Sequence, residues 1–296
     1  MRAMEPSPHQ DAARELALAE TVMLIGAIDT GKTTMSRRIM EEALRLGRRV
    51  GYVDADIGNT TCGPPACAGM KLVQDETGLD NLTLADGLHF VGGISPDRLV
   101  LQQVIATAAL VERARQRSDL VVVDTTGIVS GVVGESLKYH KMELCRPDRV
   151  VALQRGAEME PVVGMLRRFF GAEVVSLPVE PDVLPSSPDA RAARRTARFR
   201  EVFTPPLDRW RVKPTVFAPT LPSGLDPNRL DGILVGIHDE SGLCTGLGYL
   251  EVDDGTLRVV TSRGEGMQGL RLGSLRIDPA TFSTRPVNLR EVMFGL

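Results

Sequence analysis

The amino-acid sequence predicts an α/β protein with a parallel sheet covered by helices on both faces, followed by a smaller β-rich unit. Two observations lead to this prediction. From residue 21 to about 177, apolar runs alternate with segments of helical periodicity, a pattern typical of parallel sheets in layered α/β folds. From residue 232 to 262, short apolar runs are separated only by turn signals, which indicates antiparallel strands.

The first elements follow from local patterns. Residues 21–26 (TVMLIG) form an apolar run that ends at a glycine and predict a buried strand. Residues 36–47 have helical spacing and end at Gly47, and residues 48–56 predict a second strand. Residues 57–70 are rich in Gly, Pro and small side chains and predict a loop.

The same alternation continues along the chain. Residues 88–93 predict a third strand. Ser95 and Pro96 fit an N-cap and a first helical position, which predicts a helix from there to about residue 117. The remaining pattern predicts strands at 119–124, 148–154 and 172–177, and helices at 134–145 and 158–170.

The composition is that of an ordinary globular protein. Of the 296 residues, 43% are hydrophobic and 25% are charged, which excludes a disordered or collagen-like chain and suggests about two domains. The net charge is −3, so any site for a polyanion must be local.

Several features indicate the compartment. No run approaches the roughly 18 apolar residues of a transmembrane helix, and the N-terminus lacks the basic-then-apolar pattern of a secretory signal. The four cysteines fit neither a paired zinc-ligand pattern nor a disulfide framework. We therefore expect a cytoplasmic protein with free thiols and no membrane partner.

A phosphate-binding motif follows the first predicted strand. Residues 26–33 match G-x4-G-K-[ST] and lie between a strand and a helix, as a P-loop requires. In such a loop, backbone amides face phosphate oxygens, while Lys32 would reach the β- and γ-phosphates and the Thr33 hydroxyl would ligate Mg²⁺. The motif predicts a P-loop NTPase sheet. The expected nucleotide-binding residues are Gly26, Ala27, Asp29, Thr30, Gly31, Lys32, Thr33 and Thr34.

Three aspartates lie at strand ends. Asp54 and Asp56 close the second predicted strand, and Asp124 closes the strand at 119–124. Such carboxylates lie at the sheet edge near the P-loop, where they can support Mg²⁺. If strand geometry persists, Asp54 and Asp56 share a face, so one could orient Mg²⁺ while the other accepts a proton from an attacking hydroxyl. The stretch also fits a simple turn, and spacing does not decide which aspartate is the base.

A basic segment lies between proline-rich stretches. Residues 189–203 predict a helix whose arginines Arg191, Arg194, Arg195 and Arg198 form one stripe. Placed as a lid over the P-loop, this stripe would neutralise charge on a transferring phosphoryl group or hold the phosphates of a nucleic-acid acceptor. A solvated helix face is the simpler interpretation of such a charge run.

The combined pattern resembles the P-loop polynucleotide 5′-hydroxyl kinase family. Its eukaryotic members act in mRNA 3′-end processing, tRNA splicing and pre-rRNA processing, and it has archaeal and bacterial relatives. The resemblance covers residues 26–203 well and the C-terminal unit only loosely. It is carried by GAIDTGKTT (26–34), VDADIGNTTCGPP (53–65), FVGGISP (90–96), VVVDTTGIVSG (121–131), LKYHKMELCRPDRVVALQRG (137–156) and RRTARFREVF (194–203).

The resemblance implies an ATP- and Mg²⁺-dependent kinase that phosphorylates the 5′-hydroxyl end of RNA or DNA. It implies that Asp56 activates the hydroxyl, that residues 125–127 form the family's clasp motif, and that Arg195 and Arg198 are its R-x-x-R lid pair. The expected site residues are therefore Lys32, Asp56, Arg195 and Arg198 for catalysis, Thr33, Asp54 and Asp124 for the metal, and Thr125, Thr126, Gly127 and Arg194 for the substrate.

The chain departs from the family in three places. Ile128 stands where eukaryotic members usually carry Trp, and Asn59 stands where Gln often follows the aspartates. The chain also begins about 20 residues before the P-loop strand, without the separate N-terminal domain of the eukaryotic members, so their partner-docking surfaces are not expected here. Protein partners stay open.

The expected organisation has four parts. These are an N-terminal helix or arm (1–20), a P-loop kinase domain (21–204) with a lid at about 185–203, a proline-rich linker (205–230) and a β-rich C-terminal domain (231–296).

Two other functions compete with the kinase. A regulatory P-loop ATPase or GTPase of the partition or metallochaperone type shares the strand-D-x-D-x-G pattern. However, Ala27 replaces the extra lysine of partition ATPases, and no His/Cys metal cluster or Asn-Lys-x-Asp motif is present. An ATP-binding scaffold without catalysis is the third hypothesis, and the intact set of acidic and P-loop residues argues against it.

Overall fold

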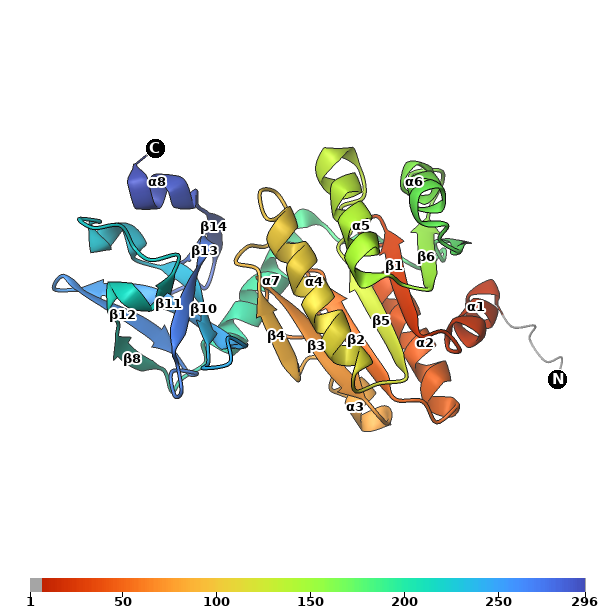
Figure 1. The fold of residues 1–296 in the computed structure, drawn as a ribbon, viewed down its shortest axis with the longest axis horizontal. Coiled ribbons are helices and arrows are strands. Elements are labelled where there is room, and N and C mark those ends of the chain that lie inside the picture. The colour runs from red at the N-terminus through yellow and green to blue at the C-terminus, as the bar shows by residue number, and fades with distance from the viewer. Residues whose placement is uncertain (1–6, 296) are drawn as a thin grey trace.

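The computed structural model describes residues 7–295, in which one continuous sheet joins two units (Figure 1). The N-terminal unit contains the strands β1 (Thr21–Gly26), β2 (Val50–Ala55), β3 (Cys67–Val73), β4 (Gly87–Phe90), β5 (Leu120–Thr125), β6 (Arg149–Gln154) and β7 (Val174–Pro178). Its helices are α1 (Pro8–Leu16), α2 (Lys32–Arg45), α3 (Glu76–Asp80), α4 (Val100–Arg115), α5 (Gly131–Cys145) and α6 (Glu160–Phe170).

The predicted α/β architecture is confirmed, with one correction. The sheet order is β4-β3-β2-β5-β1-β6-β7, and β2, β5, β1, β6 and β7 are parallel. Strand β3 instead runs antiparallel to both of its neighbours, β2 and β4, so β4 points in the same direction as the parallel strands. The stretch predicted as a loop over 57–70 already enters β3 at Cys67. Its small side chains gave no strand signal, but they suit a strand that is buried at this position.

A second difference concerns the start of α4. The helix begins at Val100, five residues after Ser95. The Ser95 hydroxyl donates to the Asp97 carboxylate at 2.7 Å, and Arg98 has a φ of 63°. A left-handed residue breaks helical geometry, so the Ser-Pro-Asp signal forms a turn here and does not cap the helix.

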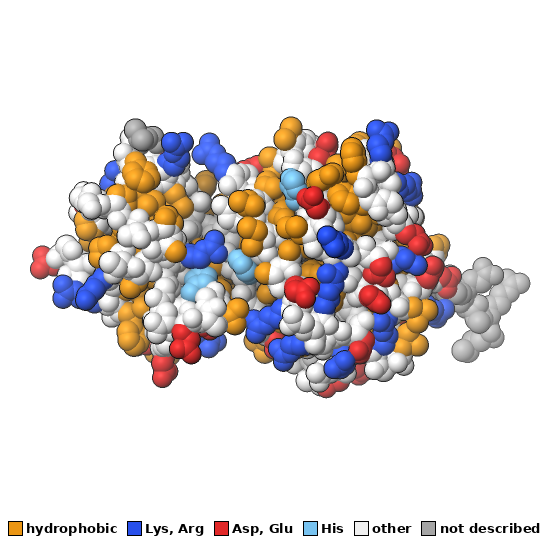
Figure 2. Space-filling model, in the orientation of Figure 1, with side chains coloured by type: hydrophobic (Ala, Val, Ile, Leu, Met, Phe, Trp, Pro, Cys, Tyr) orange, Lys and Arg blue, Asp and Glu red, His pale blue; other side chains and the backbone are white. Residues whose placement is uncertain are grey.

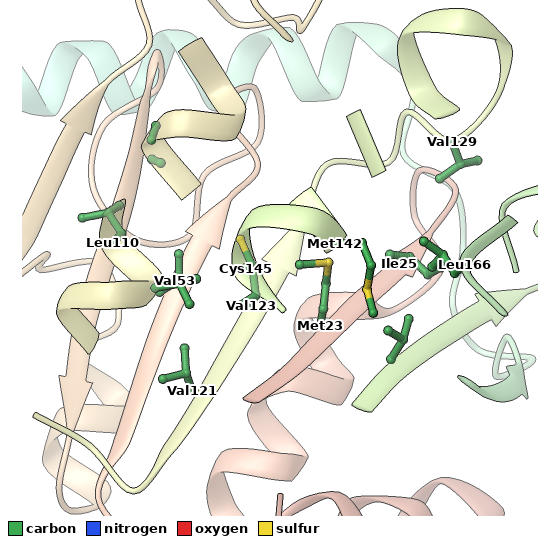
Figure 3. Packing of buried hydrophobic residues seen from close by; sticks show 14 of the residues in the cluster. Met23, Ile25, Val53, Leu110, Val121, Val123, Val129, Met142, Cys145 and Leu166 are labelled. Atoms are coloured by element: carbon green, nitrogen blue, oxygen red, sulfur yellow. The ribbon is translucent and has the colours of Figure 1, made fainter. Parts of the chain in front are cut away.

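Helices cover both faces of the parallel strands. One hydrophobic core lies under α4, α5 and α6, and a second lies under α1 and α2. Figure 3 shows Met142 and Cys145 of α5 over Met23 and Val123 of the sheet. This packing leaves the carboxyl ends of β1, β2 and β5 together at one edge, where ligands bind in sheets of this type.

The C-terminal unit is a β-rich layer that extends the same sheet, since β11 pairs with β4. Residues 253–256 form the predicted hairpin turn, with Asp253 opposite Thr256. The proline-rich stretch 205–230 carries two short strands of this unit. Its elements are β8 (Asp208–Arg211), β9 (Phe217–Ala218), β10 (Ile233–His238), β11 (Cys244–Asp253), β12 (Thr256–Thr261), β13 (Gly269–Ile277), β14 (Thr284–Pro286) and α8 (Leu289–Phe294), with 3₁₀ turns at Pro214–Val216 and Pro227–Leu230.

The basic segment forms helix α7 (Pro188–Val202), which lies between the two units (Figure 1). Ser187 caps it by accepting from the Ala190 amide at 3.1 Å. Phe199 lies near the C-terminal end of α7, and Phe203 directly follows the helix. Both side chains are fully buried in a core shared by both units. This anchor leaves the N-terminal half of α7 facing the P-loop.

All four cysteines are buried and free. None of the described helices combines the length and apolar character needed to cross a membrane. On the face drawn in Figure 2, acidic and basic side chains intermingle. That face therefore shows no extended basic track.

Candidate active site

The P-loop connects β1 to α2 in the predicted way. Gly31 ends the loop with a φ of +85°, a backbone conformation that favours glycine. The Lys32 ammonium is buried and donates to the carbonyl oxygens of Gly26 at 3.0 Å and Ala27 at 2.7 Å. Burial lowers the pKa of Lys32, while Asp124, Asp56 and Asp29 act in the opposite direction. The lysine is thus held inside the loop that would surround the phosphates.

Asp124 lies at the end of β5, beside the P-loop. Its carboxylate accepts from the Thr33 hydroxyl at 2.6 Å and from the Tyr52 hydroxyl at 3.3 Å. Burial raises the pKa of Asp124, while Lys32 and the Thr33 hydrogen bond lower it. A hydroxyl and a carboxylate in contact are oxygen donors of the kind that Mg²⁺ prefers. In the described part of the chain, no three His, Cys, Asp or Glu side chains are grouped to hold a metal by themselves.

The two aspartates after β2 have different surroundings. Asp54 is 1% exposed, and its carboxylate accepts from the backbone amides of Asp56 at 2.9 Å, Thr61 at 2.5 Å and Cys62 at 2.9 Å. Burial and the neighbouring carboxylates raise the pKa of Asp54, and the amides of Cys62 and Asp56 oppose that shift. Asp54 therefore fixes the loop that follows the strand.

The two carboxylate oxygens of Asp56 differ in their hydrogen bonding. Its Oδ1 accepts from the amides of Gly58 and Asn59, both at 3.1 Å. Its Oδ2 has no hydrogen-bond partner among residues 7–295. Because β2 ends at Ala55, the expected shared face of Asp54 and Asp56 does not persist. Of these two aspartates, only Asp56 lines the cavity beside the P-loop.

The lid reaches the P-loop through Asp29. This carboxylate accepts from the Ser186 amide at 2.7 Å and forms an ion pair with Arg191 at 3.3 Å. Arg155, after β6, donates to the Asp29 carbonyl oxygen at 2.5 Å. The N-terminal half of α7 is thus tied to the nucleotide-binding loop.

The lid arginines divide between two places. Arg195 is near the cavity without a hydrogen-bond partner in the described part of the chain; burial and nearby Arg191 lower its pKa. Arg198 lies one turn further and donates to the Gly63 carbonyl at 2.9 Å and to Glu201 at 2.7 Å. It lines a separate hollow between the two units, about 710 Å³ in volume.

The residues of the expected clasp, Thr125, Thr126 and Gly127, follow β5. The Thr125 hydroxyl donates to the Leu24 carbonyl at 2.7 Å. A Cβ on Gly127 would lie 2.6 Å from the Ile28 nitrogen, so only glycine permits this approach of the clasp to the P-loop.

These parts surround one cavity of about 490 Å³. Most of the predicted site residues line it. They are Asp29, Thr30, Gly31, Lys32, Thr33, Thr34, Asp56, Asp124, Thr126, Gly127, Arg194 and Arg195. Gly26, Ala27, Asp54, Thr125 and Arg198 lie outside its lining.

Several residues at the site carried no clear sequence signal. Arg191 was one of four stripe arginines, and nothing in the stripe marked it as the partner of Asp29. Arg155 lies near the end of the segment 137–156, but nothing there marked it as a partner of Asp29. Behind the site and outside the cavity lining, Lys138 and Lys141 of helix α5 are 1% and 0% exposed. Both belong to the segment 137–156 that carries the family resemblance, which implied no role for either, and their spacing of three residues places them on one helix face.

Lys141→Met is expected to stabilise the fold. The Lys141 ammonium has no hydrogen-bond partner among the described residues, and burial lowers its pKa from 10.5 to about 8. Below pH 8 the Lys141 side chain is protonated in both the folded and the unfolded state, and burying its charge lowers the free energy of unfolding by about 3 kcal/mol. Between pH 8 and 10.5 the unfolded state binds more protons, so wild-type stability rises with pH.

Urea unfolding at pH 7 and pH 9.5 measures this effect. The variant should be the more stable protein at pH 7, and the difference should shrink at pH 9.5. Equal stability of both proteins at both pH values would contradict the assignment of a costly buried charge.

Known proteins are similar to this chain over the region that contains the P-loop. The family model described as mRNA cleavage and polyadenylation factor CLP1 P-loop matches residues 26–205. A polyribonucleotide 5′-hydroxyl-kinase of Methanocaldococcus jannaschii is 26% identical, with 87% of each chain covered. One from Pyrococcus furiosus is 27% identical over 93% of this chain and 86% of its own.

The solved structure of a Clp1p–Pcf11p complex has the same fold. It gives a TM-score of 0.68 at 15% identity and covers 90% of this chain and 77% of that one. The likeness therefore extends over both units of the sheet.

Proposed function

The chain belongs to the CLP1 P-loop family, and from this we propose that it is an ATP-dependent polyribonucleotide 5′-hydroxyl kinase. The observation that carries the proposal is the single cavity lined by Lys32, Thr33, Asp56, Asp124 and Arg195. A phosphate-binding loop, a carboxylate with a free oxygen and an unpaired arginine are the parts that phosphoryl transfer to a hydroxyl requires. The similarity to the archaeal kinases over most of the chain supports the same activity.

In the proposed reaction, Asp56 removes the proton of the 5′-hydroxyl. The 5′-oxygen then forms a bond to the γ-phosphorus, the bond from that phosphorus to the β–γ bridging oxygen breaks, and ADP leaves. The proton stays on the Asp56 carboxylate until solvent removes it. Lys32 would exchange its bonds to Gly26 and Ala27 for bonds to the β- and γ-phosphates.

We assign Mg²⁺ support to Thr33 and Asp124, because their oxygens meet at the cavity. When bound, Mg²⁺ neutralises part of the charge on the phosphate oxygens. Asp54 was also expected at the metal, but its oxygens are taken by three backbone amides. We therefore give Asp54 the role of holding the loop that presents Asp56.

We propose that Arg195 stabilises the transferring phosphoryl group and that Arg194 contacts the acceptor phosphates. In this proposal Arg198 does not join Arg195 at the phosphoryl group, because its guanidinium donates to Gly63 and Glu201. Arg191 holds the lid through Asp29. Of the charged lid residues, only Arg195 is left without a partner at the cavity.

Arg195→Ala and Arg198→Ala should therefore differ. Removing Arg195 is expected to lower phosphate transfer by about 10²-fold or more, as for other donors to developing charge. Removing Arg198 should cost less than about tenfold, since it acts on transfer only through the lid's position. Initial rates with saturating ATP and oligonucleotide give the comparison. Equal losses in both variants would instead indicate that Arg195 and Arg198 act together, as the family resemblance implies.

The activity itself is tested by transfer from γ-labelled ATP with Mg²⁺ to matched 5′-hydroxyl RNA and DNA oligonucleotides. Label at the 5′ end is expected, with RNA as the better acceptor. A 5′-phosphorylated oligonucleotide is the matched control and should take no label. ATP hydrolysis without transfer would favour a regulatory ATPase, and ATP binding without either reaction would favour a scaffold.

A further inference from the structure

The clasp (Thr125, Thr126 and Gly127) shares a wall with the P-loop. Thr126 and Gly127 line the nucleotide cavity, and Gly127 packs against the backbone of Ile28. A small shift of this segment would move the acceptor relative to the γ-phosphate. Displacements of about 1 Å at such a position can cost about 10²-fold in rate.

Lys138 is the side chain that fixes the clasp from behind. It lies on α5, is 1% exposed, and donates from Nζ to the Thr126 carbonyl at 2.7 Å. Within residues 7–295, no other side chain donates a hydrogen bond to the clasp backbone. Thr126 is itself 6% exposed, so this carbonyl depends on Lys138 for a partner.

Lys141 provides a comparison on the same helix. It is equally buried, but its ammonium reaches no acceptor in the described structure. It also lies outside the cavity lining. The two lysines therefore share burial, helix and residue type, and they differ in the contact with the clasp.

We infer that Lys138 is a positioning residue for the 5′-hydroxyl acceptor, which it serves by holding the clasp against the P-loop. The inference rests on the proposed kinase function. Lys138 does not touch the reacting atoms, because it lies behind the clasp and outside the cavity lining. Its effect passes through the Thr126 backbone.

The test compares Lys138→Met with the matched control Lys141→Met. With saturating ATP, the kcat/KM for a 5′-hydroxyl RNA oligonucleotide should fall about 10- to 100-fold in Lys138→Met, while the KM for ATP stays within about twofold of the wild type. Lys141→Met should leave both values unchanged. Replacing a residue that only supports the fold would change the KM for ATP and the kcat/KM for the acceptor together.

Hydrogen exchange supplies a readout that does not need turnover. The amides of residues 126–130 should exchange about tenfold faster in Lys138→Met and at the wild-type rate in Lys141→Met. If Lys138→Met does not fold, Lys138→Gln, which keeps a polar end on a shorter stem, should show the same local increase. Wild-type exchange and wild-type acceptor kinetics in either folded Lys138 variant would overturn the inference.

The two proposals fail in different ways. A wild-type protein that transfers no phosphate removes the kinase proposal, and the acceptor role falls with it. The structural part, that Lys138 orders the clasp, is still decided by the exchange rates. If the wild type is an active kinase and the Lys138 variants have unchanged kinetics and exchange rates, the kinase function stands and only the role of Lys138 is refuted.

Discussion

Replacing Asp56 by Asn is expected to lower the rate of phosphate transfer by about 10²- to 10⁴-fold, the range for loss of a general base. The asparagine oxygen can still accept from the amides of Gly58 and Asn59, so the loop should keep its shape. The amide nitrogen would replace the free Oδ2 and could not take a proton. The KM for ATP should change little, because the contacts of Lys32 and Thr33 are untouched.

Single-turnover transfer with labelled ATP measures the effect on chemistry. The matched control is Asp54→Asn, two residues away, whose carboxylate accepts three backbone amides. An amide nitrogen there would oppose one of those donors, so this variant should lower the melting temperature, whereas Asp56→Asn should not. If Asp56→Asn kept wild-type turnover, the base would have to be another group.

The sequence predicted the strand ends well, because a strand-to-loop junction is a local pattern. The P-loop and Asp124 lie where the motif and the apolar run placed them. The pattern was less informative where the backbone leaves regular geometry. Asp56 lies beyond the end of β2, so alternation along the strand no longer described the direction of its side chain.

The lid shows a second limit. Helical spacing identified a stripe of arginines, but it could not say which turn of the helix meets the P-loop. That is decided by tertiary packing: Phe199 and Phe203 bury the C-terminal end of α7 between the units, and Asp29 fixes the N-terminal half. Arg195 is consequently at the cavity, while Arg198 is held against Gly63.

The strand β3 and its antiparallel direction were missed for a related reason, whereas the strand predicted at 88–93 is present as β4. Alternating apolar and helical segments were assigned to a uniformly parallel sheet, and nothing local to β3 sets its direction. This strand contains small residues such as Ala68 and Gly69, which pack closely under the loop fixed by Asp54. A Cβ on Gly69 would lie 2.2 Å from the Cys62 carbonyl oxygen. Such residues carry little strand propensity on their own.

Lys32→Met should strongly lower the rate of phosphate transfer while leaving the protein folded. The loss is expected to be at least about 10²- to 10³-fold, as when a preorganised donor to developing charge is removed. The methionine keeps most of the apolar stem. The fold should be no less stable, because the buried ammonium carries a desolvation cost that lowers its pKa, although the Gly26 and Ala27 carbonyls lose their donor.

The same substitution at another buried lysine separates the phosphate-binding role from the removal of a buried charge. Lys141→Met also removes a buried ammonium, but from a position outside the cavity lining. ATP with Mg²⁺ should raise the melting temperature of the wild type and of Lys141→Met, since a ligand at about 100 times its Kd stabilises the folded state by about 2.7 kcal/mol. The shift should be strongly reduced in Lys32→Met. Transfer by Lys32→Met at more than a tenth of the wild-type rate would show that the P-loop lysine does not stabilise the transferring group, and the backbone amides and lid arginines would then have to carry that charge alone.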